Sequence, residues 1–177
     1  MIGVTMQNII PANQEVHIRL RVNGQPYAVA VRPAQMLAQV LREELGLPGT
    51  KVACGMANCG ACTVLRDGVP IYSCITLALD CDGHEITTIE GLAQDGQLHP
   101  LQRAFIQEDA FQCGFCTSGQ ILTLAAFLAR KPKPSAGDIR QAVAGNLCRC
   151  GAYIKIVKAG LAAAEMMEHG ETSQDQD

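Results

Sequence analysis

The spacing of its cysteines constrains this chain more than any other feature of the sequence. Nine cysteines occur in 177 residues, and eight of them fall into two sets of four. An odd number of cysteines in tight sets is not typical of the disulfide framework of a small secreted domain. It indicates thiolates that hold a metal ion or a metal cluster. We call the sets the first cysteine group (Cys54, Cys59, Cys62 and Cys74) and the second cysteine group (Cys113, Cys116, Cys148 and Cys150).

The first cysteine group has the pattern Cys-x4-Cys-x2-Cys, followed by eleven residues and the fourth cysteine. This spacing is typical of plant-type ferredoxins, in which four thiolates hold one [2Fe–2S] cluster. Gly55 and Gly60 allow the loop to turn tightly and let backbone N–H groups approach the sulfurs, which raises the potential of an anionic cluster. A zinc site more often draws its thiolates from paired Cys-x2-Cys knuckles. The spacing therefore favours a [2Fe–2S] cluster over zinc.

The second cysteine group consists of Cys113-x2-Cys116 and Cys148-x-Cys150, separated by thirty-one residues. Each pair lies just before a predicted helix, one from Thr117 and one from Ala152. Two helix N-termini would then point at one anionic centre and stabilise its charge. A four-thiolate zinc site would be stabilised in the same way, so the spacing leaves zinc and a cluster both open.

The order of predicted elements indicates an α+β fold. Apolar and polar residues alternate from Val16 to Val22, and Asn23-Gly24 is a strong hairpin signal before a return strand at Tyr27–Val31. Apolar residues at helical spacing between Pro33 and Gly46 predict one helix. Further strands are expected at 63–65, 71–72 and 85–89. These elements suit a small sheet curled around one helix.

The second half of the chain is expected to be all helical. Helices are predicted at 101–109, 117–130, 135–144 and 152–168, which suggests a compact four-helix bundle. The third should begin at a capping box formed by Ser135 and Asp138. The predicted organisation is a first domain at 14–92, a helical domain at 93–169 and a disordered polar tail at 170–177.

Composition and charge argue against several classes of function. The net charge of −3 and the aromatic content of 4% disfavour a nucleic-acid partner. The longest apolar run, Ile121–Ala129, is too short to span a bilayer, and Met1–Asn13 has no basic secretion signal. We therefore expect a cytoplasmic protein without a membrane segment, which could leave the cytoplasm bound to an exported partner. No dinucleotide-binding loop or acid–base pair is recognisable, so no catalytic residue is assigned.

Three runs of residues surround the cysteines. They are Cys54-Gly-Met-Ala-Asn-Cys-Gly-Ala-Cys-Thr63, Gln112-Cys-Gly-Phe-Cys-Thr-Ser-Gly119 and Gly145-Asn-Leu-Cys-Arg-Cys-Gly151. In this order they resemble the small iron–sulfur subunit of the molybdenum hydroxylases, the family of xanthine dehydrogenase, aldehyde oxidoreductase and aerobic carbon monoxide dehydrogenase. The resemblance extends from about Val16 to Met167.

The resemblance implies an N-terminal β-grasp, plant-type ferredoxin-like domain followed by an all-α four-helix bundle domain, with one [2Fe–2S] cluster in each. It thereby resolves the choice between zinc and a cluster in the second cysteine group. The first cysteine group would hold the cluster distal to molybdenum, and the second cysteine group the proximal one. Gln112 and Cys150 would lie against the pterin of the molybdenum cofactor, which belongs to a large partner subunit.

Two positions depart from the usual residues of the family. Ser118 and Gln120 stand where proline and methionine are most common. Ser118 is expected to act as a helix N-cap, and Gln120 to put a polar group near the partner's cofactor. Cys81, outside both groups, is expected to be a buried free thiol.

The implied function is electron transfer by an oxidoreductase subunit without a catalytic site of its own. Electrons would pass from the molybdenum cofactor through the proximal and distal clusters to an FAD subunit, a cytochrome or another acceptor. A free ferredoxin-like shuttle is an alternative, although one cluster on the first domain would suffice for it. A zinc-stabilised interaction module is another, and metal analysis separates it from both redox hypotheses.

Overall fold

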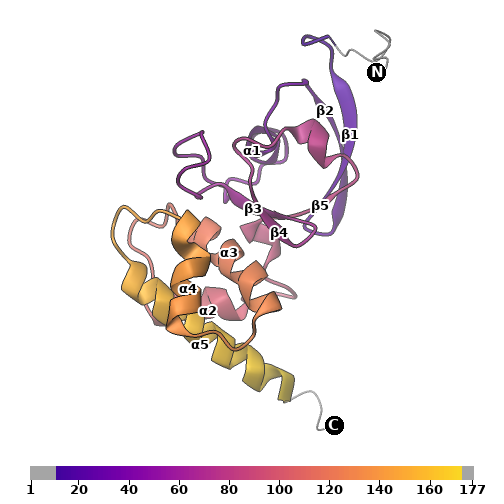
Figure 1. Ribbon diagram of the computed structural model, residues 1–177. Coiled ribbons are helices and arrows are strands. Elements are labelled where there is room, and N and C mark those ends of the chain that lie inside the picture. Colours follow the sequence, from indigo (N-terminus) through magenta and orange to yellow (C-terminus); the bar gives the residue numbers. More distant parts are fainter. Residues whose placement is uncertain (1–10, 173–177) are drawn as a thin grey trace, which may run out of the picture.

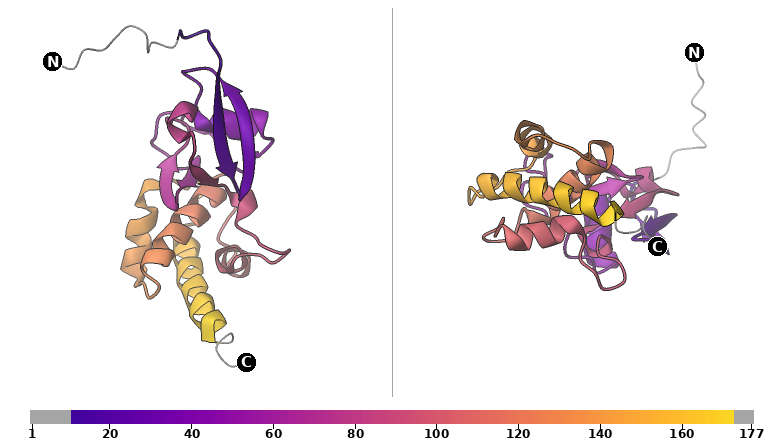
Figure 2. Two further views of the ribbon diagram at one scale, coloured as in Figure 1. Left: turned by 90° about the vertical axis from the view of Figure 1, so that its right-hand side faces the viewer. Right: turned by 90° about the horizontal axis from the view of Figure 1, so that it is seen from below.

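The computed structural model describes residues 11–172, and it has an α+β fold in which a mixed sheet precedes a helical half (Figure 1). Within these residues no helix is both long and apolar enough to cross a membrane. The sheet lies at one end of the molecule and the longer helices lie at the other, as the left view of Figure 2 shows. The expected α+β class is therefore confirmed.

Five strands form one sheet in the order β2-β1-β5-β3-β4. The pair β1 and β5 is parallel, and the other neighbours in the sheet are antiparallel. The first and last strands of the first half are thus neighbours at the centre of the sheet. The strands are β1 (Val16–Val22), β2 (Gln25–Val31), β3 (Thr63–Arg66), β4 (Val69–Tyr72) and β5 (Glu85–Thr87).

The hairpin between β1 and β2 forms where the sequence predicts it. Its two turn residues, Asn23 and Gly24, have φ of 53° and 78°, which are the left-handed values that a tight hairpin turn requires. The alternate residues Ile18, Leu20 and Val22 of β1 are buried. The return strand starts at Gln25, two residues earlier than predicted, because Gln25 pairs with Val22 directly after the turn.

The predicted helix after Pro33 begins later than expected. Pro33 and Ala34 form a turn, and α1 (Leu37–Gln39) continues directly into a π-helical segment, Val40–Glu44. Leu37, Val40 and Leu41 are buried in the same apolar core as the sheet. The apolar spacing therefore predicted the buried face correctly, although not the start of the helix.

The second half of the described chain contains the longer helices. Of three short 3-10 segments in the described chain, Ala78–Cys81 and Ile89–Gly91 belong to the first half and Val143–Gly145 belongs to the second. The helices are α2 (Pro100–Gln107), α3 (Thr117–Arg130), α4 (Ala136–Ala142) and α5 (Tyr153–Thr172). They share a core of their own, in which Phe105, Leu124, Leu128, Ile139 and Ile156 are almost completely buried.

The ends of two helices test the capping predictions. Ser135 Oγ accepts from the backbone N–H of Asp138, and the Asp138 carboxylate accepts from the N–H of Ser135, so the predicted capping box is confirmed. Helix α5 continues to Thr172, beyond the expected end at Glu168. Residues 173–177 of the predicted disordered tail lie outside the described residues.

A small third group of apolar side chains joins the sheet to the helices. Leu65 of β3 packs with Leu122 and Ala126 of α3, and Ile89 and Leu92 cover them. Helix α3 therefore touches the sheet along one face and the helical core along another (Figure 1). This contact brings the start of α3, and the cysteines before it, close to the loop that precedes β3.

Candidate functional site

The first cysteine group is built by one loop and one strand end. Cys54, Cys59 and Cys62 lie in the irregular segment before β3, and Cys74 follows β4. Ser73 connects them, because its Oγ and its backbone N–H both donate to the carbonyl oxygen of Cys62, at 2.7 and 3.3 Å. The β3–β4 hairpin therefore holds the fourth cysteine beside the third.

Backbone N–H groups point at the Cys54 sulfur, as the sequence predicts for a cluster loop. Those of Met56 and Asn58 lie 3.5 and 3.3 Å from Cys54 Sγ. With further donation from Cys59, they lower the pKa of the Cys54 thiol to about 6. The tight turn that brings them there passes through Gly55, whose φ is +65°. Cys54 is thus prepared to bind metal as a thiolate.

Two further thiols of the first cysteine group, Cys62 and Cys74, form a buried pair. Cys62 and Cys74 are both buried, and they interact with one another. Burial, and then the neighbouring Cys74, raise the pKa of the Cys62 thiol to about 12. A buried thiol with this pKa becomes a ligand only when a cation compensates its charge.

The second cysteine group lies at the start of two helices, as predicted. Cys113 and Cys116 precede α3, and Cys148 and Cys150 precede α5. Cys150 Sγ lies 3.5 Å from Cys113 Sγ. The backbone N–H of Ala152, at the start of α5, points at Cys148 Sγ from 3.4 Å.

The second cysteine group consists of two pairs, which we call the inner pair (Cys116 and Cys148) and the outer pair (Cys113 and Cys150). Cys148 is buried and Cys116 is half-buried, whereas Cys113 and Cys150 are exposed. Burial, and then the neighbouring Cys148, raise the pKa of the Cys116 thiol to about 12. The N–H of Phe115, and then Cys150, lower the pKa of the Cys113 thiol.

The thiols of both groups approach one another in pairs. Among residues 11–172, no three or more His, Cys, Asp or Glu side chains converge closely enough to hold a single metal ion. Pairs are the arrangement that two-iron clusters need, because four cysteines supply two ligands to each iron. The interacting pairs are Cys54 with Cys59, Cys62 with Cys74, Cys116 with Cys148, and Cys113 with Cys150. This donor set fits two [2Fe–2S] clusters.

The two cysteine groups lie side by side. The loop that carries Cys54 and Cys59 is next to the segments before α3 and α5 (Figure 1). The backbone N–H of Leu147 donates to the carbonyl oxygen of Cys59 at 2.8 Å, and Tyr72 Oη donates to Gly145 O at 3.0 Å. A cavity of about 410 Å³ lies between the groups, and its lining is mostly apolar, including Ala53, Ala61, Phe115, Leu147 and Tyr153.

The structure brings Gln112 to the outer pair. Gln112 is exposed, and its Nε2 donates to the carbonyl oxygen of Cys150 at 3.3 Å. The two residues that the family resemblance assigned to one contact are therefore neighbours here.

The two unusual residues of α3 are both buried. Helix α3 starts at Thr117 with Cys116 as its N-cap, so Ser118 lies inside the first turn and the predicted N-cap role is wrong. Ser118 Oγ is buried and has no hydrogen-bond partner among the described residues. Gln120 has no exposed surface and donates through Nε2 to Asn146 O at 3.0 Å. It therefore packs against the loop before Cys148, and its nearness to a partner's cofactor stays a prediction.

Cys81 and Asn146 lie outside both cysteine groups, and the sequence predicted the position of only the first. Cys81 is completely buried in the core of the sheet, and burial raises the pKa of its thiol, as expected for a free thiol used in packing. Asn146 was missed as a functional candidate, although it lies in the quoted run, two residues before Cys148. It is buried and hydrogen-bonds to the first cysteine loop, a contact across more than eighty residues that no local pattern reports.

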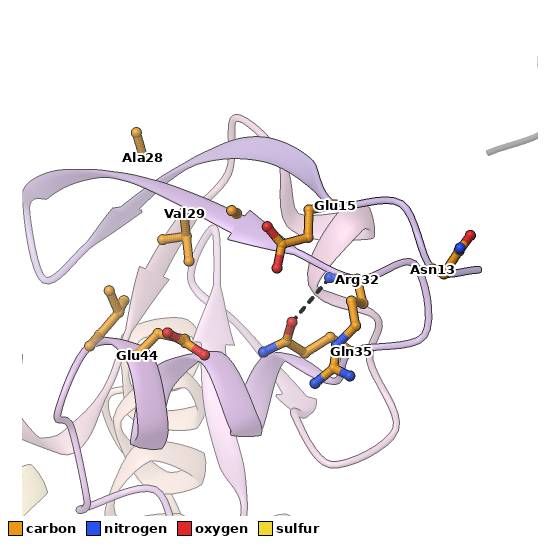
Figure 3. Close-up of a pocket in the computed structure, with 9 residues that line it drawn as sticks. Asn13, Glu15, Ala28, Val29, Arg32, Gln35 and Glu44 are labelled. Atoms are coloured by element: carbon orange, nitrogen blue, oxygen red, sulfur yellow. Dashed lines mark hydrogen bonds between the residues drawn. The ribbon is translucent and has the colours of Figure 1, made fainter. Parts of the chain in front are cut away.

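A second hollow lies away from both cysteine groups. It has a volume of about 800 Å³ and lies beside β2, between Gln35, which precedes α1, and Glu44 at the end of the π-helical segment (Figure 3). Its polar lining includes Glu15, Arg32, Gln35 and Glu44, and Gln35 Oε1 accepts from the backbone N–H of Arg32 at 3.1 Å. Its lining contains no cysteine.

Two family models match the chain. The model described as a 2Fe-2S iron-sulfur cluster binding domain matches residues 20–86, and the one described as a [2Fe-2S] binding domain matches residues 88–161. Each of these ranges contains one complete cysteine group.

Relatives of known description cover most of the chain. It is 47% identical over 149 residues to a probable xanthine dehydrogenase subunit of Bacillus subtilis, covering 84% of this chain and 85% of that protein. It is also 42% identical over 151 residues to the nicotinate dehydrogenase small FeS subunit of Eubacterium barkeri, covering 85% and 96% of the two chains.

Solved structures have the same fold. A chain of quinoline 2-oxidoreductase from Pseudomonas putida 86 is 44% identical, with a TM-score of 0.85 over 90% of this chain and 99% of that one. The aldehyde oxidoreductase of Desulfovibrio gigas is 38% identical with a TM-score of 0.83. This match covers 88% of the present chain but only 17% of the length of that oxidoreductase.

Proposed function

Because the chain belongs to the small [2Fe–2S] subunits of the molybdenum hydroxylases, we propose that it relays electrons from a molybdenum cofactor in a large partner subunit, through two clusters, to a flavin subunit or another acceptor. The chain is an electron-transfer component of an oxidoreductase complex. Bound [2Fe–2S] clusters supply one-electron chemistry, and the task of the protein is to set their positions, potentials and separation.

The ligand assignment is part of this proposal. Four thiols hold the distal cluster, two from the half-exposed pair Cys54 and Cys59 and two from the buried pair Cys62 and Cys74. Four thiols hold the proximal cluster, two from the inner pair Cys116 and Cys148 and two from the outer pair Cys113 and Cys150. The pairwise approach of the sulfurs and the N–H groups directed at Cys54 and Cys148 support it.

Exposure supports the proposed order of the two clusters. The outer pair of the second cysteine group faces solvent, and Gln112 is bonded to Cys150 there. We place the pterin of the partner's molybdenum cofactor against this surface. The inner pair faces the first cysteine group, where Leu147 N–H is bonded to Cys59 O. That hydrogen bond is the observation that carries the proposal, because it connects a residue next to one proposed ligand with a ligand of the other cluster.

Exposed apolar side chains around the second cysteine group support docking of the large subunit there. Phe111, Phe115, Leu147, Tyr153 and Ile154 are all exposed, and Ile154 is 77% accessible. Concentrated exposed apolar residues next to a functional site mark protein interfaces more often than they mark free surface. Tyr153 also accepts a hydrogen bond from the backbone N–H of Cys148 at 2.7 Å, so this surface is continuous with the proximal ligands.

The division into domains belongs to the same proposal. We infer a β-grasp, ferredoxin-like domain at 14–92 and a four-helix bundle domain at 93–169. The strand order β2-β1-β5-β3-β4 around α1, the separate cores of sheet and helices, and the two matched ranges all support it.

Metal analysis of the complex purified from its native source tests this function. We expect about four irons and about four acid-labile sulfides per copy of the chain, from two [2Fe–2S] clusters, together with co-purifying molybdenum. Zinc in place of iron would contradict both redox assignments. A chain that carries four irons but elutes alone, without a large subunit, would contradict the subunit role and favour a free electron shuttle.

A further inference from the structure

We propose that Asn146 is a positioning residue that fixes the separation between the two clusters. This inference rests on the proposed function, since it assumes that both cysteine groups hold clusters. Asn146 lies in the loop before Cys148, belongs to neither set of ligands, and is only 3% exposed although it is polar.

The side chain of Asn146 reaches the first cysteine group. Its Nδ2 donates to the carbonyl oxygen of Gly60 at 3.0 Å, and the same nitrogen lies 3.4 Å from Thr63 Oγ1. Gly60 lies directly between Cys59 and Ala61, and Thr63 directly after Cys62. One amide group is thus bonded to the backbone between two proposed ligands of the distal cluster.

The remaining hydrogen-bonding groups of Asn146 are bonded to the helical half. Its Oδ1 accepts from Thr123 Oγ1 at 3.0 Å, and its backbone oxygen accepts from Gln120 Nε2 at 3.0 Å. Its backbone N–H donates to Val143 O at 2.9 Å. Both ends of the side-chain amide are therefore engaged, each by a different half of the molecule, and a buried amide satisfied in this way has a single orientation.

The backbones of the first cysteine loop, of the start of α3 and of the loop before Cys148 are so close together that no side chain fits between them. A Cβ on Gly60 would lie 2.5 Å from Gly145 O and 2.6 Å from Asn146 Nδ2. A Cβ on Gly119, in the first turn of α3, would collide with the carbonyl oxygen of Gly60. The absence of a side chain at Gly60 and Gly119 allows the backbones of the loop and of α3 to come into contact. The side chain of Asn146 packs against both glycines.

Fixing this contact fixes the distance over which an electron must pass. The rate of electron tunnelling falls steeply as two redox centres move apart. Asn146 holds the loop of Cys59 against the loop of Cys148, and the hydrogen bond from Leu147 to Cys59 lies between them. Loss of the amide would let the two loops separate, while each cysteine group keeps its four cysteines.

The test compares three variants of the native complex with a matched control. Asn146→Ala removes the whole amide, and Thr123→Val removes only the hydroxyl that orients it, with little change of volume. Thr123→Ser retains that hydroxyl. Thr88→Val is the control, because the hydroxyl of buried Thr88 also bonds to an asparagine amide, accepting from Asn23 Nδ2 at 2.9 Å, and neither residue belongs to the cysteine loops.

The readout is the magnetic interaction between the two reduced clusters, measured as splitting in their EPR spectra, with iron content determined on the same samples. We expect Asn146→Ala and Thr123→Val to keep all their iron but to lose or shift the splitting. Thr123→Ser and Thr88→Val should keep the wild-type splitting, which separates positioning from a general loss of stability.

Two results would overturn the inference in distinguishable ways. An unchanged splitting in Thr123→Val and in any Asn146→Ala that retains its iron would show that Asn146 does not set the separation, while the proposed function would stand. If Asn146→Ala does not fold, Thr123→Val alone decides. A wild-type complex without two [2Fe–2S] signals would overturn the proposed function, and this inference with it.

Discussion

The backbone N–H of Leu147 donates a hydrogen bond to the carbonyl oxygen of Cys59 across 2.8 Å, although the two residues are far apart in the chain. Leu147 directly precedes Cys148, so this one bond joins the neighbour of a proposed proximal ligand to the backbone of a proposed distal ligand. The first prediction concerns its removal.

Leu147→Pro should slow the transfer of electrons between the clusters, because proline has no N–H to donate. The backbone of Asn146, with φ −118° and ψ 109°, has the extended conformation that a residue before proline requires. Rapid-freeze EPR during reduction of the complex by its substrate should show the proximal cluster reduced while the distal cluster lags.

Leu147→Ala is the control for that variant, since it removes the same exposed side chain but retains the N–H. In this variant, the delay between reduction of the proximal cluster and reduction of the distal cluster should equal that of the wild type. Equal kinetics in the proline and alanine variants would show that the hydrogen bond is not part of the electron path.

Cys62→Ala should remove the distal cluster and spare the proximal one. Iron should fall from about four to about two per chain, because a [2Fe–2S] cluster needs four cysteine ligands. Cys81→Ala removes a similarly buried thiol that lies in neither group, and it should retain all its iron. Loss of iron in Cys81→Ala would contradict the assignment of ligands.

Gly60→Ala should destabilise the protein more than Gly24→Ala does. Both glycines have positive φ, 69° and 78°, which costs any other residue roughly 1–2 kcal/mol. Only Gly60 is also crowded, and forcing a methyl group against Gly145 O should add roughly 1–3 kcal/mol. Chemical unfolding of both variants measures the difference, and equal losses would contradict the close contact between the cysteine loops.

Ile154→Asp should weaken association with the large subunit, because a charge replaces an apolar side chain that the partner would bury. Val69→Asp is a matched control, since Val69 is 57% exposed and lies next to the Asp67-Gly68 turn, at the opposite end of the β3–β4 hairpin from Tyr72. Co-purification of the large subunit with each variant measures the effect. A complex that tolerates Ile154→Asp as well as Val69→Asp would place the interface elsewhere.

Local patterns predicted most of the elements of this fold. The alternation in β1, the Asn23-Gly24 turn, the bounds of α3 and the capping box at Ser135 all depend on residues within a few positions of one another. The delayed start of α1 and the position of Ser118 inside α3 were not predicted, because Cys116 takes the N-cap position and the turn at Pro33 continues into an extended Met36.

The candidate site, like the fold, was predictable only in part. Spacing alone favoured a cluster in the first cysteine group, and family resemblance was needed for the second. The contacts of Asn146 and Gln120 could not be predicted, since Asn146 bonds to Gly60 in the other half of the molecule and Gln120 bonds to Asn146 across 26 residues of sequence. The complete burial of Gln120 against Asn146 was not expected from the sequence, which predicts only that its polar group lies near a partner's cofactor.

EPR spectroscopy of the fully reduced native complex tests the central claim most directly. Two clusters in two different protein environments should give two distinct [2Fe–2S] signals that together integrate to about two spins per copy of the chain. A single signal that integrates to one spin would contradict the account of a two-cluster relay.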